Sequence, residues 1–177
     1  MGATNDNLEE LKKVSKIDVA GIKIFMGSST GNMLVDAQNT LEEIFQLDHQ
    51  LITHCEDENI IKSNLEKAKA EFGENIPIRM HPVIRSERAC YLSSSSAVEL
   101  AKKHGSRLHV FHISTAKETE LFSNKLPLSE KKITAEVCVH HLWFDDGQYD
   151  TKGSHIKWNP AVKTARERNG LWNALLN

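Results

Sequence analysis

The stretch VAGIKIFMGSSTGN, residues 19–32, sets the pattern of the whole chain, an apolar run followed by a loop rich in glycine, serine and threonine. Residues 22–26, IKIFM, read as a short buried strand. Lys23 stands inside this run, although lysine is rarely buried without a partner. The side chain therefore points to solvent, pairs with an acid or takes part in chemistry. The strand alone leaves these three alternatives open.

Strands and helices alternate along the rest of the chain. Further strands are predicted at 50–55 (QLITHC), at 107–114 (RLHVFHIS) and within 132–144 (KITAEVCVHHLWF), where the strand leads into a loop. Helices are predicted at 6–16, from about 40, at 57–72, at 86–104, at 114–124 and from 164 onwards. Alternation of this kind is typical of a parallel sheet with helices on its face. The 177 residues form one predicted domain, 1–177. A (β/α)8 barrel typically needs about 250 residues, and this chain supplies roughly half the strands of one, whereas a small doubly wound sheet could be complete at this length.

Capping residues set the predicted helix ends. Gly73 and Gly105 each follow a predicted helix as a C-terminal stop. Ser114 is predicted to cap the helix that follows it, and Thr164 to cap the last one. In that last helix, the predicted inward residues are Leu171, Trp172 and Leu175.

The composition excludes two classes of partner. The 22 Lys and Arg residues against 24 Asp and Glu give a net charge of −2, and no basic run is long enough to follow a phosphate backbone, so nucleic acid is excluded. No apolar run approaches the roughly 20 residues that a membrane span needs.

The beginning, MGATNDNLEELKK, lacks the apolar segment of a secretion signal. The three cysteines are far apart and odd in number, which indicates a reducing, cytoplasmic location.

Three residues at strand positions are candidates for chemistry. His54 lies near the end of the second predicted strand, His112 near the end of the third, and Lys23 inside the first. Because the ends of parallel strands meet at one edge, the two histidines can converge on one metal ion. Imidazole suits Zn²⁺, and a catalytic zinc site needs about three protein ligands. The alternative is that each histidine is a hydrogen-bonded core residue and that the lysine reaches solvent at a sheet edge.

Five segments, taken in order, resemble dihydroorotases of the amidohydrolase superfamily: GIKIFMGSSTGN, LITHCEDE, LHVFHIST, TAEVCVHHLWF and KWNPAVKT. The HHL at 140–142 and the asparagine of KWNP resemble dihydroorotases more than hydantoinases or allantoinases. The resemblance covers nearly the whole chain. It implies an α/β fold that is a partial TIM (β/α)8 barrel, about strands four to seven with their helices.

The resemblance also implies roles for the three candidates. Lys23 matches a lysine that CO₂ converts to a carbamate, which bridges two Zn²⁺ ions. His54 and His112 match ligands of the more exposed of these two metals. An amine in a low-dielectric strand end is more readily neutral, as reaction with CO₂ requires.

The substrate contacts follow from the same resemblance. Asn159 matches a residue that contacts the pyrimidine ring, and Ser29 or Thr30 matches the contact of a mobile loop that closes over substrate. Two local departures, NPAVK for NPPLR and Cys138-Val139 for Thr-Pro, indicate an outlying subfamily. The adjacent His140 and His141 are predicted to lie in a strand, pointing to opposite faces.

The activity that the resemblance implies is the reversible cyclisation of N-carbamoyl-L-aspartate to L-dihydroorotate in de novo pyrimidine biosynthesis. The H-x-H pair and the general-base aspartate that serve this reaction in the family have no match in this sequence, so we expect the isolated chain to be inactive. A half-open parallel sheet exposes apolar edges, which predicts a homodimer or a need for further strands. Two alternatives stay open, a cyclic amidase of the hydantoinase or dihydropyrimidinase type and a non-catalytic scaffold partner of a transcarbamoylase.

Overall fold

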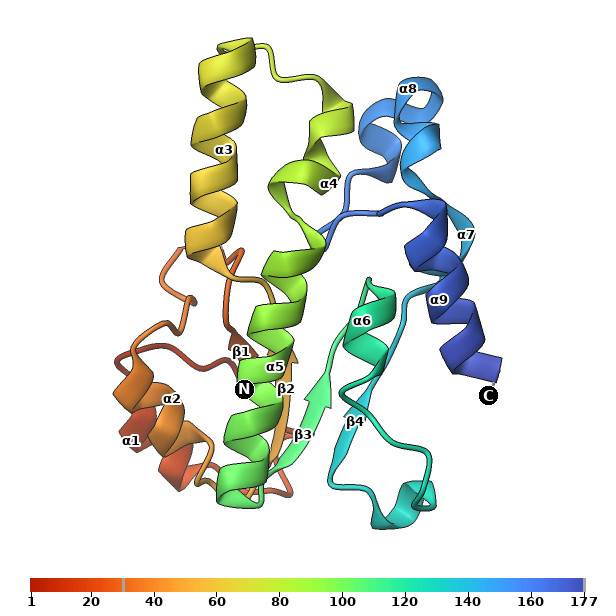
Figure 1. The fold of residues 1–177 in the computed structure, drawn as a ribbon. Coiled ribbons are helices and arrows are strands. Elements are labelled where there is room, and N and C mark those ends of the chain that lie inside the picture. The colour runs from red at the N-terminus through yellow and green to blue at the C-terminus, as the bar shows by residue number, and fades with distance from the viewer. Residues whose placement is uncertain (30, 177) are drawn as a thin grey trace.

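The computed structural model describes residues 1–29 and 31–176 and contains one parallel sheet. Its strands are β1 (Ile22–Phe25), β2 (Gln50–His54), β3 (Arg107–Val110) and β4 (Ile133–Ala135). The strands pair in chain order, each parallel to the next (Figure 1). A doubly wound sheet reverses its strand order at a switch point, whereas the order here runs in one direction, as it does around a (β/α)8 barrel. The α/β prediction is therefore confirmed, and the barrel alternative is favoured.

Helices precede and follow these strands. They are α1 (Leu8–Lys13), α2 (Gln38–Ile44), α3 (Glu58–Phe72), α4 (His81–Ile84), α5 (Glu87–His104), α6 (Ala116–Thr119), α7 (Val139–Trp143), α8 (Tyr149–Lys152) and α9 (Ala165–Leu176). Figure 1 shows α5 and α6 over one face of the sheet, and α3, α4 and α8 beyond the carboxyl ends of the strands. None of the helices among the described residues has the length and apolar character that crossing a membrane requires.

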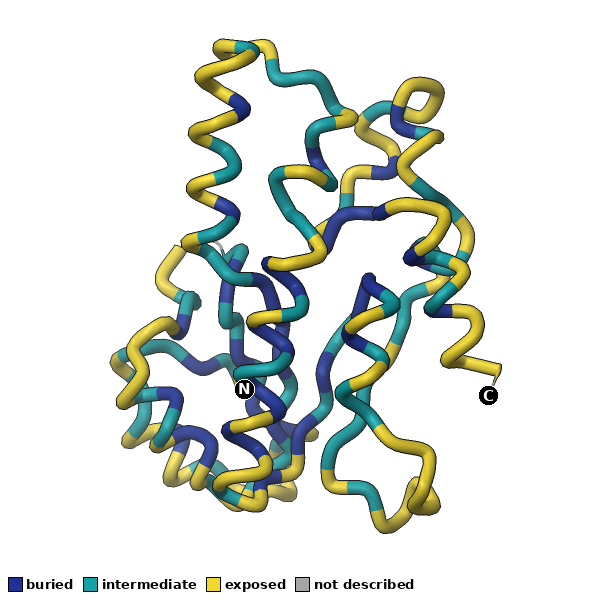
Figure 2. Tube along the Cα trace, viewed as in Figure 1, coloured by how far each residue is buried: buried dark blue, intermediate teal, exposed yellow. Residues whose placement is uncertain are grey.

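The main core lies between the sheet and its helices. Alternate strand residues are fully buried there: Ile22, Ile24, Leu51, Leu108 and Val110. They pack in one cluster with small residues of α5, such as Ala97 and Ala101. Figure 2 shows buried stretches of the strands and of α5 in dark blue. Because successive strand side chains point to opposite faces, Lys23, Phe25 and His109 lie on the other face, where they are half-buried. The lysine of the opening stretch therefore does not enter the main core.

A close backbone approach links the loops that follow β1 and β2. A Cβ atom added to Gly27 would lie 1.9 Å from the carbonyl oxygen of Glu56, so only glycine fits there. The next residue, Ser28, has a positive φ of 55° and directs its side chain toward Glu56. The contact of these two loops brings the ends of β1 and β2 together.

Several helix ends agree with the prediction, and others do not. Gly73 and Gly105 end α3 and α5 with φ of 63° and 68°, as predicted. The cap of α6 is Thr115 and not Ser114, because the Thr115 hydroxyl accepts from the Glu118 amide while the Glu118 carboxylate accepts from the Thr115 amide. That helix has a single turn and ends at residue 119, not 124.

The end of the chain also corrects the prediction. β4 stops at Ala135, and His140 and His141 lie in α7. The two rings are neighbours, with centroids 4.3 Å apart, and do not point to opposite faces of a strand. In α9, Leu171 is buried as predicted, but Trp172 and Leu175 are 40% and 55% exposed.

Candidate metal centre

His54 and His112 meet at the carboxyl ends of β2 and β3. The Nδ1 atom of His54 lies 3.2 Å from the Nε2 atom of His112, and the ring planes are 74° apart. Two imidazole nitrogens that bind one tetrahedral zinc, each at about 2.0–2.1 Å, are separated by about 3.3 Å. The observed separation therefore fits two ligands of one metal, and it also fits a hydrogen bond between the rings.

The surroundings of His54 fit a metal ligand. The Nε2 atom of His54 lies 3.0 Å from the Oε2 atom of Glu56. Since an ionised carboxylate only accepts, Nε2 carries the ring hydrogen and Nδ1 of a neutral ring keeps its lone pair, directed toward His112. A carboxylate behind a histidine is the usual arrangement at protein metal sites, because it fixes the tautomer and orients the ring.

Glu56 is completely buried and accepts from three groups. Besides His54, these are the Oγ of Ser28 at 2.8 Å and the Nη1 of Arg85 at 2.5 Å. Burial by itself raises the pKa of Glu56, but the hydrogen bond from His54 and the charge of Arg85 outweigh it and lower the pKa to about 2. The carboxylate is therefore ionised at neutral pH and holds the charge that orients His54.

The backbone and the burial of His112 prepare its ring for a metal. Its φ of 38° lies in the left-handed region, which non-glycine residues seldom adopt. Strained residues of this kind cluster at functional sites. Burial, together with the neighbouring His54 and Lys23, lowers the pKa of His112 to about 3, so the ring is neutral, as metal ligation requires. Its Nδ1 atom is buried and has no hydrogen-bond partner among the described residues.

Lys23 lies on the same side of the sheet as the two histidines. Its Nζ atom is 4.0 Å from the ring centroid of Phe111 and 4.9 Å from that of Phe25. Those two rings in turn lie 5.8 Å from the rings of His112 and His54, respectively. Within residues 1–29 and 31–176, Lys23 forms no ion pair. Burial lowers the pKa of its amine to about 8, which increases the neutral fraction that can react with CO₂.

The substrate contacts predicted from the sequence lie apart from this pair of histidines. Asn159 is exposed and lines a cavity of about 330 Å³ together with Arg85 and Lys157. Arg85 connects the two places, since its guanidinium also donates to Glu56. Ser29 is half-buried and directly follows Ser28, which bonds to Glu56. Thr30 lies outside the described residues.

The sequence interpretation missed the residues that surround the histidines. Glu56, Arg85 and Ser28 form one hydrogen-bonded group around the buried carboxylate. The signal for Glu56 was its position two residues after His54, on the same segment. Arg85 gave no local signal, because its contact with Glu56 arises only when α4 folds over the strand ends.

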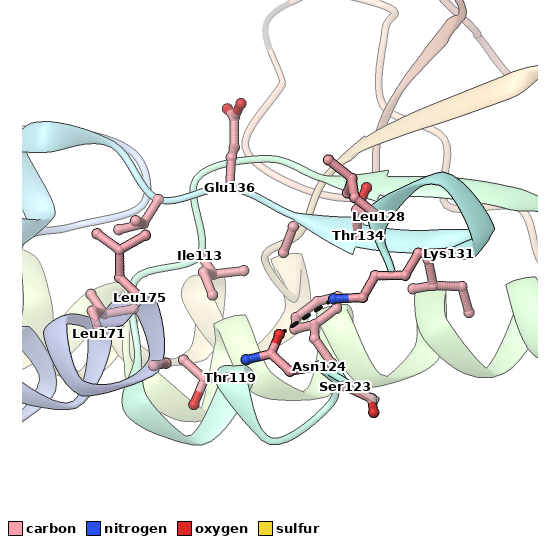
Figure 3. A pocket seen from close by; sticks show the side chains of 15 residues that line it. Ile113, Thr119, Ser123, Asn124, Leu128, Lys131, Thr134, Glu136, Leu171 and Leu175 are labelled. Carbon is pink, nitrogen blue, oxygen red and sulfur yellow. Dashed lines mark hydrogen bonds between the residues drawn. The ribbon is translucent and has the colours of Figure 1, made fainter. Parts of the chain in front are cut away.

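The donor set in this chain is small. No three His, Cys, Asp or Glu side chains gather around one point within the residues that the structure describes. The candidate centre therefore consists of the two imidazoles with Lys23 beside them. A larger cavity, of about 660 Å³, lies elsewhere, between β4, the segment after α6 and α9 (Figure 3). Its lining is mainly apolar and includes Ile113, Leu171 and Leu175, and neither histidine contributes to it.

Comparisons with known proteins bear on the fold of the chain. No protein-family model matches the chain. An allantoinase from Salmonella paratyphi B is 25% identical over 188 residues, which cover 99% of this chain and 40% of the relative. Among solved structures, the L-hydantoinase (dihydropyrimidinase) from Arthrobacter aurescens is similar with a TM-score of 0.84 and 25% identity, over 98% of this chain and 39% of that one.

A dihydroorotase from Campylobacter jejuni is more distant. It matches with a TM-score of 0.59 and 19% identity, over 98% of this chain and 44% of that one. The chain spans about two fifths of the length of the curated relatives that it matches. The sheet order, the sequence likeness and the structural likeness agree: this chain has the fold of part of a cyclic amidohydrolase barrel of the amidohydrolase superfamily.

Proposed function

We propose that this chain forms part of a metal-dependent cyclic amidohydrolase. The observation that carries the proposal is the facing pair of ring nitrogens in His54 and His112, with the buried carboxylate of Glu56 behind one of them. A carboxylated Lys23 would be the third ligand of a Zn²⁺ ion held by these two histidines. Zinc at such a site polarises an amide carbonyl and lowers the pKa of a bound water.

Residues of this chain would orient the metal ligands and bind the substrate. Glu56 holds His54 in the tautomer that leaves its Nδ1 lone pair available, and the strained backbone of His112 directs the second ring. Asn159 would bind the ring of the substrate through its carboxamide, which has one acceptor and two donor hydrogens. The general base of the reaction is not assigned to any residue of this chain.

Two substrate classes compete, and each has a specific support. The L-hydantoinase and allantoinase likenesses favour a hydantoin-like or allantoin-like ring. The asparagine of KWNP and the HHL sequence favour L-dihydroorotate, as in dihydroorotases. Measurement of kcat/KM for hydantoin, dihydrouracil, allantoin and dihydroorotate with the whole protein and Zn²⁺ separates them. Turnover of none of the four would contradict the enzymatic proposal and would favour the scaffold alternative.

Zinc content tests the metal ligands independently of activity. We expect about one zinc per chain in the purified protein, and its loss in His112→Ala and Lys23→Ala. His104→Ala is the matched control, since His104 bonds to Glu42 at the far end of α5. Equal zinc content in the unaltered protein and its three variants would contradict the assignment. The contact between the two imidazoles would then be only a hydrogen bond.

A further inference from the structure

Two histidines hold the loop that carries Asn159, one from each side. The Nε2 atom of His81, in α4, lies 2.7 Å from the carbonyl oxygen of Trp158. The Nε2 atom of His141, in α7, lies 3.1 Å from the carbonyl oxygen of Pro160. Because a carbonyl oxygen only accepts, each ring carries a hydrogen on Nε2 and donates it. The two bonds bracket the backbone of the residue between these carbonyls.

Both rings are buried, so loss of either hydrogen bond would cost more than loss of a bond at the surface. His81 is 8% exposed and His141 is 3% exposed, although they come from segments far apart in the chain. Removal of a donor from a buried carbonyl leaves that oxygen unpaired, which costs more than loss of a surface bond. A third ring, His140, stacks on Trp158 with centroids 4.3 Å apart and planes 17° apart. Three side chains, one from α4 and two from α7, therefore hold this loop.

The side chain of Asn159 is placed differently from its backbone. It is exposed and lines the cavity of about 330 Å³ beside Arg85 and Lys157. Among the described residues its carboxamide has no hydrogen-bond partner. A carboxamide that is unpaired in a cavity, on a backbone that two buried donors hold, is suited to bind a ligand without a large loss of conformational entropy.

We propose that His81 and His141 are positioning residues, which orient Asn159 to bind the amide group of a cyclic substrate in this cavity. The inference rests on the proposed function, because that function supplies the cyclic amide. A ring N–H and the adjacent C=O are complementary to the carboxamide oxygen and nitrogen of Asn159. Neither histidine touches the substrate, so both act through the loop.

Equilibrium binding tests the proposal without turnover. The whole protein is freed of metal, and the Kd values of hydantoin and dihydroorotate are measured by calorimetry. His81→Leu and His141→Leu remove the donors, whereas His81→Gln and His141→Gln keep an N–H at a similar reach. We expect the Leu variants to bind about threefold to tenfold more weakly, the effect of one hydrogen bond, and the Gln variants to bind within about twofold of the unaltered protein. His104→Leu is the control and keeps its affinity.

A double-mutant cycle separates positioning from general stability. In an Asn159→Ala background, the Leu substitutions have no further effect on Kd, because the group they position is gone. Unchanged affinity in the single Leu variants would overturn the proposal. So would a loss that Gln does not restore and that persists without the asparagine side chain.

A separate readout distinguishes failure of the inference from failure of the proposed function. If the unaltered protein binds neither ring compound, the proposed function fails. Hydrogen exchange of the backbone amides at residues 157–159 then decides the inference by itself. Faster exchange in the Leu variants, but not in the Gln variants, supports it, and equal exchange in both overturns it.

Discussion

Two of the buried glutamates, Glu56 and Glu118, are bonded in opposite ways. Glu56, at the candidate metal centre, is ionised and accepts from Arg85 and His54, and its Oε1 atom has no partner among the described residues. Glu118, in α6, accepts only from neutral donors, which are the hydroxyl of Ser94, the amide of Ser114, and the amide and hydroxyl of Thr115. Burial raises the pKa of Glu118, whereas the pKa of Glu56 is lowered.

Two lysine amines, the buried one of Lys163 and the half-buried one of Lys23, differ in the same way. Lys163 donates to the Oγ of Ser114 at 2.9 Å, to the carbonyl oxygen of Ala161 at 3.2 Å and to the Sγ of Cys90 at 3.4 Å. Lys23 instead faces two aromatic rings. A network with all its partners stabilises a fold, whereas one with an unpaired acceptor and an unpaired ring nitrogen has capacity left for a ligand. The comparison thus separates a structural cluster from a functional one.

The largest effect on stability should follow removal of Glu118, whose donors all lose their acceptor. Glu118→Ala leaves two hydroxyls and two backbone amides without their acceptor, so we expect the free energy of unfolding to fall by on the order of 3–5 kcal/mol. Urea titration measures this loss. Zinc content of the folded protein should stay unchanged. A loss below about 1 kcal/mol, within the usual range of surface substitutions, would remove the distinction between the two glutamates.

Substitution of Glu56 should lower the affinity for metal more than it lowers the stability of the fold. Glu56→Gln removes the charge behind His54, and we expect zinc affinity to fall by about 10-fold to 100-fold, as for other carboxylates behind metal-bound histidines. Competition with a chelator measures the affinity. Glu99→Gln, on the exposed face of α5, is the control. Equal affinities in both variants would show that Glu56 does not support a metal ligand.

The pH dependence of stability should sharpen the contrast for Glu118. Its pKa is raised above 4.5 in the folded chain by burial, although Ser94 and the charge of Lys163 oppose this. Because the folded chain holds this proton more tightly than the unfolded chain does, protonated Glu118 stabilises the fold. This contribution to the free energy of unfolding is fully present below about pH 4.5 and is lost as the pH rises through the folded-state pKa. Glu118→Gln cannot ionise and should lack this loss, a difference of at most about 1.4 kcal/mol per pH unit. Parallel stability–pH curves for the two proteins would contradict the raised pKa.

The smallest expected effect on stability comes from substitution of two adjacent serines, Ser94 and Ser95. Ser94 donates to Glu118 at 2.6 Å, whereas the buried Oγ of Ser95 has no partner among the described residues. Ser94→Ala should cost about 1 kcal/mol, the usual value of one hydrogen bond, and Ser95→Ala should cost nothing or stabilise the chain. Thermal unfolding of both variants checks this. An equal cost for the two would mean that the Glu118 bond adds nothing.

Local patterns predicted the strands and the two long helices. The apolar run at β1 and the glycines after α3 and α5 are signals within a few residues of the feature they set. The helical setting of His140 was missed because HHLW follows an apolar strand without a glycine or proline between them. The exposure of Leu175 was missed because helical spacing gives a face but not what covers it.

The candidate site was predictable only in part. The two histidines are brought together, as their strand-end positions predicted, because parallel strands share one edge. The roles of Lys23, His54, His112, Asn159 and Ser29 remain predictions, and so does that of Thr30. The contact of Arg85 with Glu56 depends on the fold of α4 over the strand ends, which no local spacing indicates.

The parallel order of the strands has a consequence for the speed of folding. Leu51 pairs with Leu108, so the whole segment from α3 to α5 must be closed into a loop before β2 and β3 bond. Closure of large loops is entropically costly, and folds dominated by distant pairings form slowly. We expect α3 and α5 to form well before the sheet. During that interval the apolar strands are exposed to other chains, and the yield of refolding should fall as protein concentration rises.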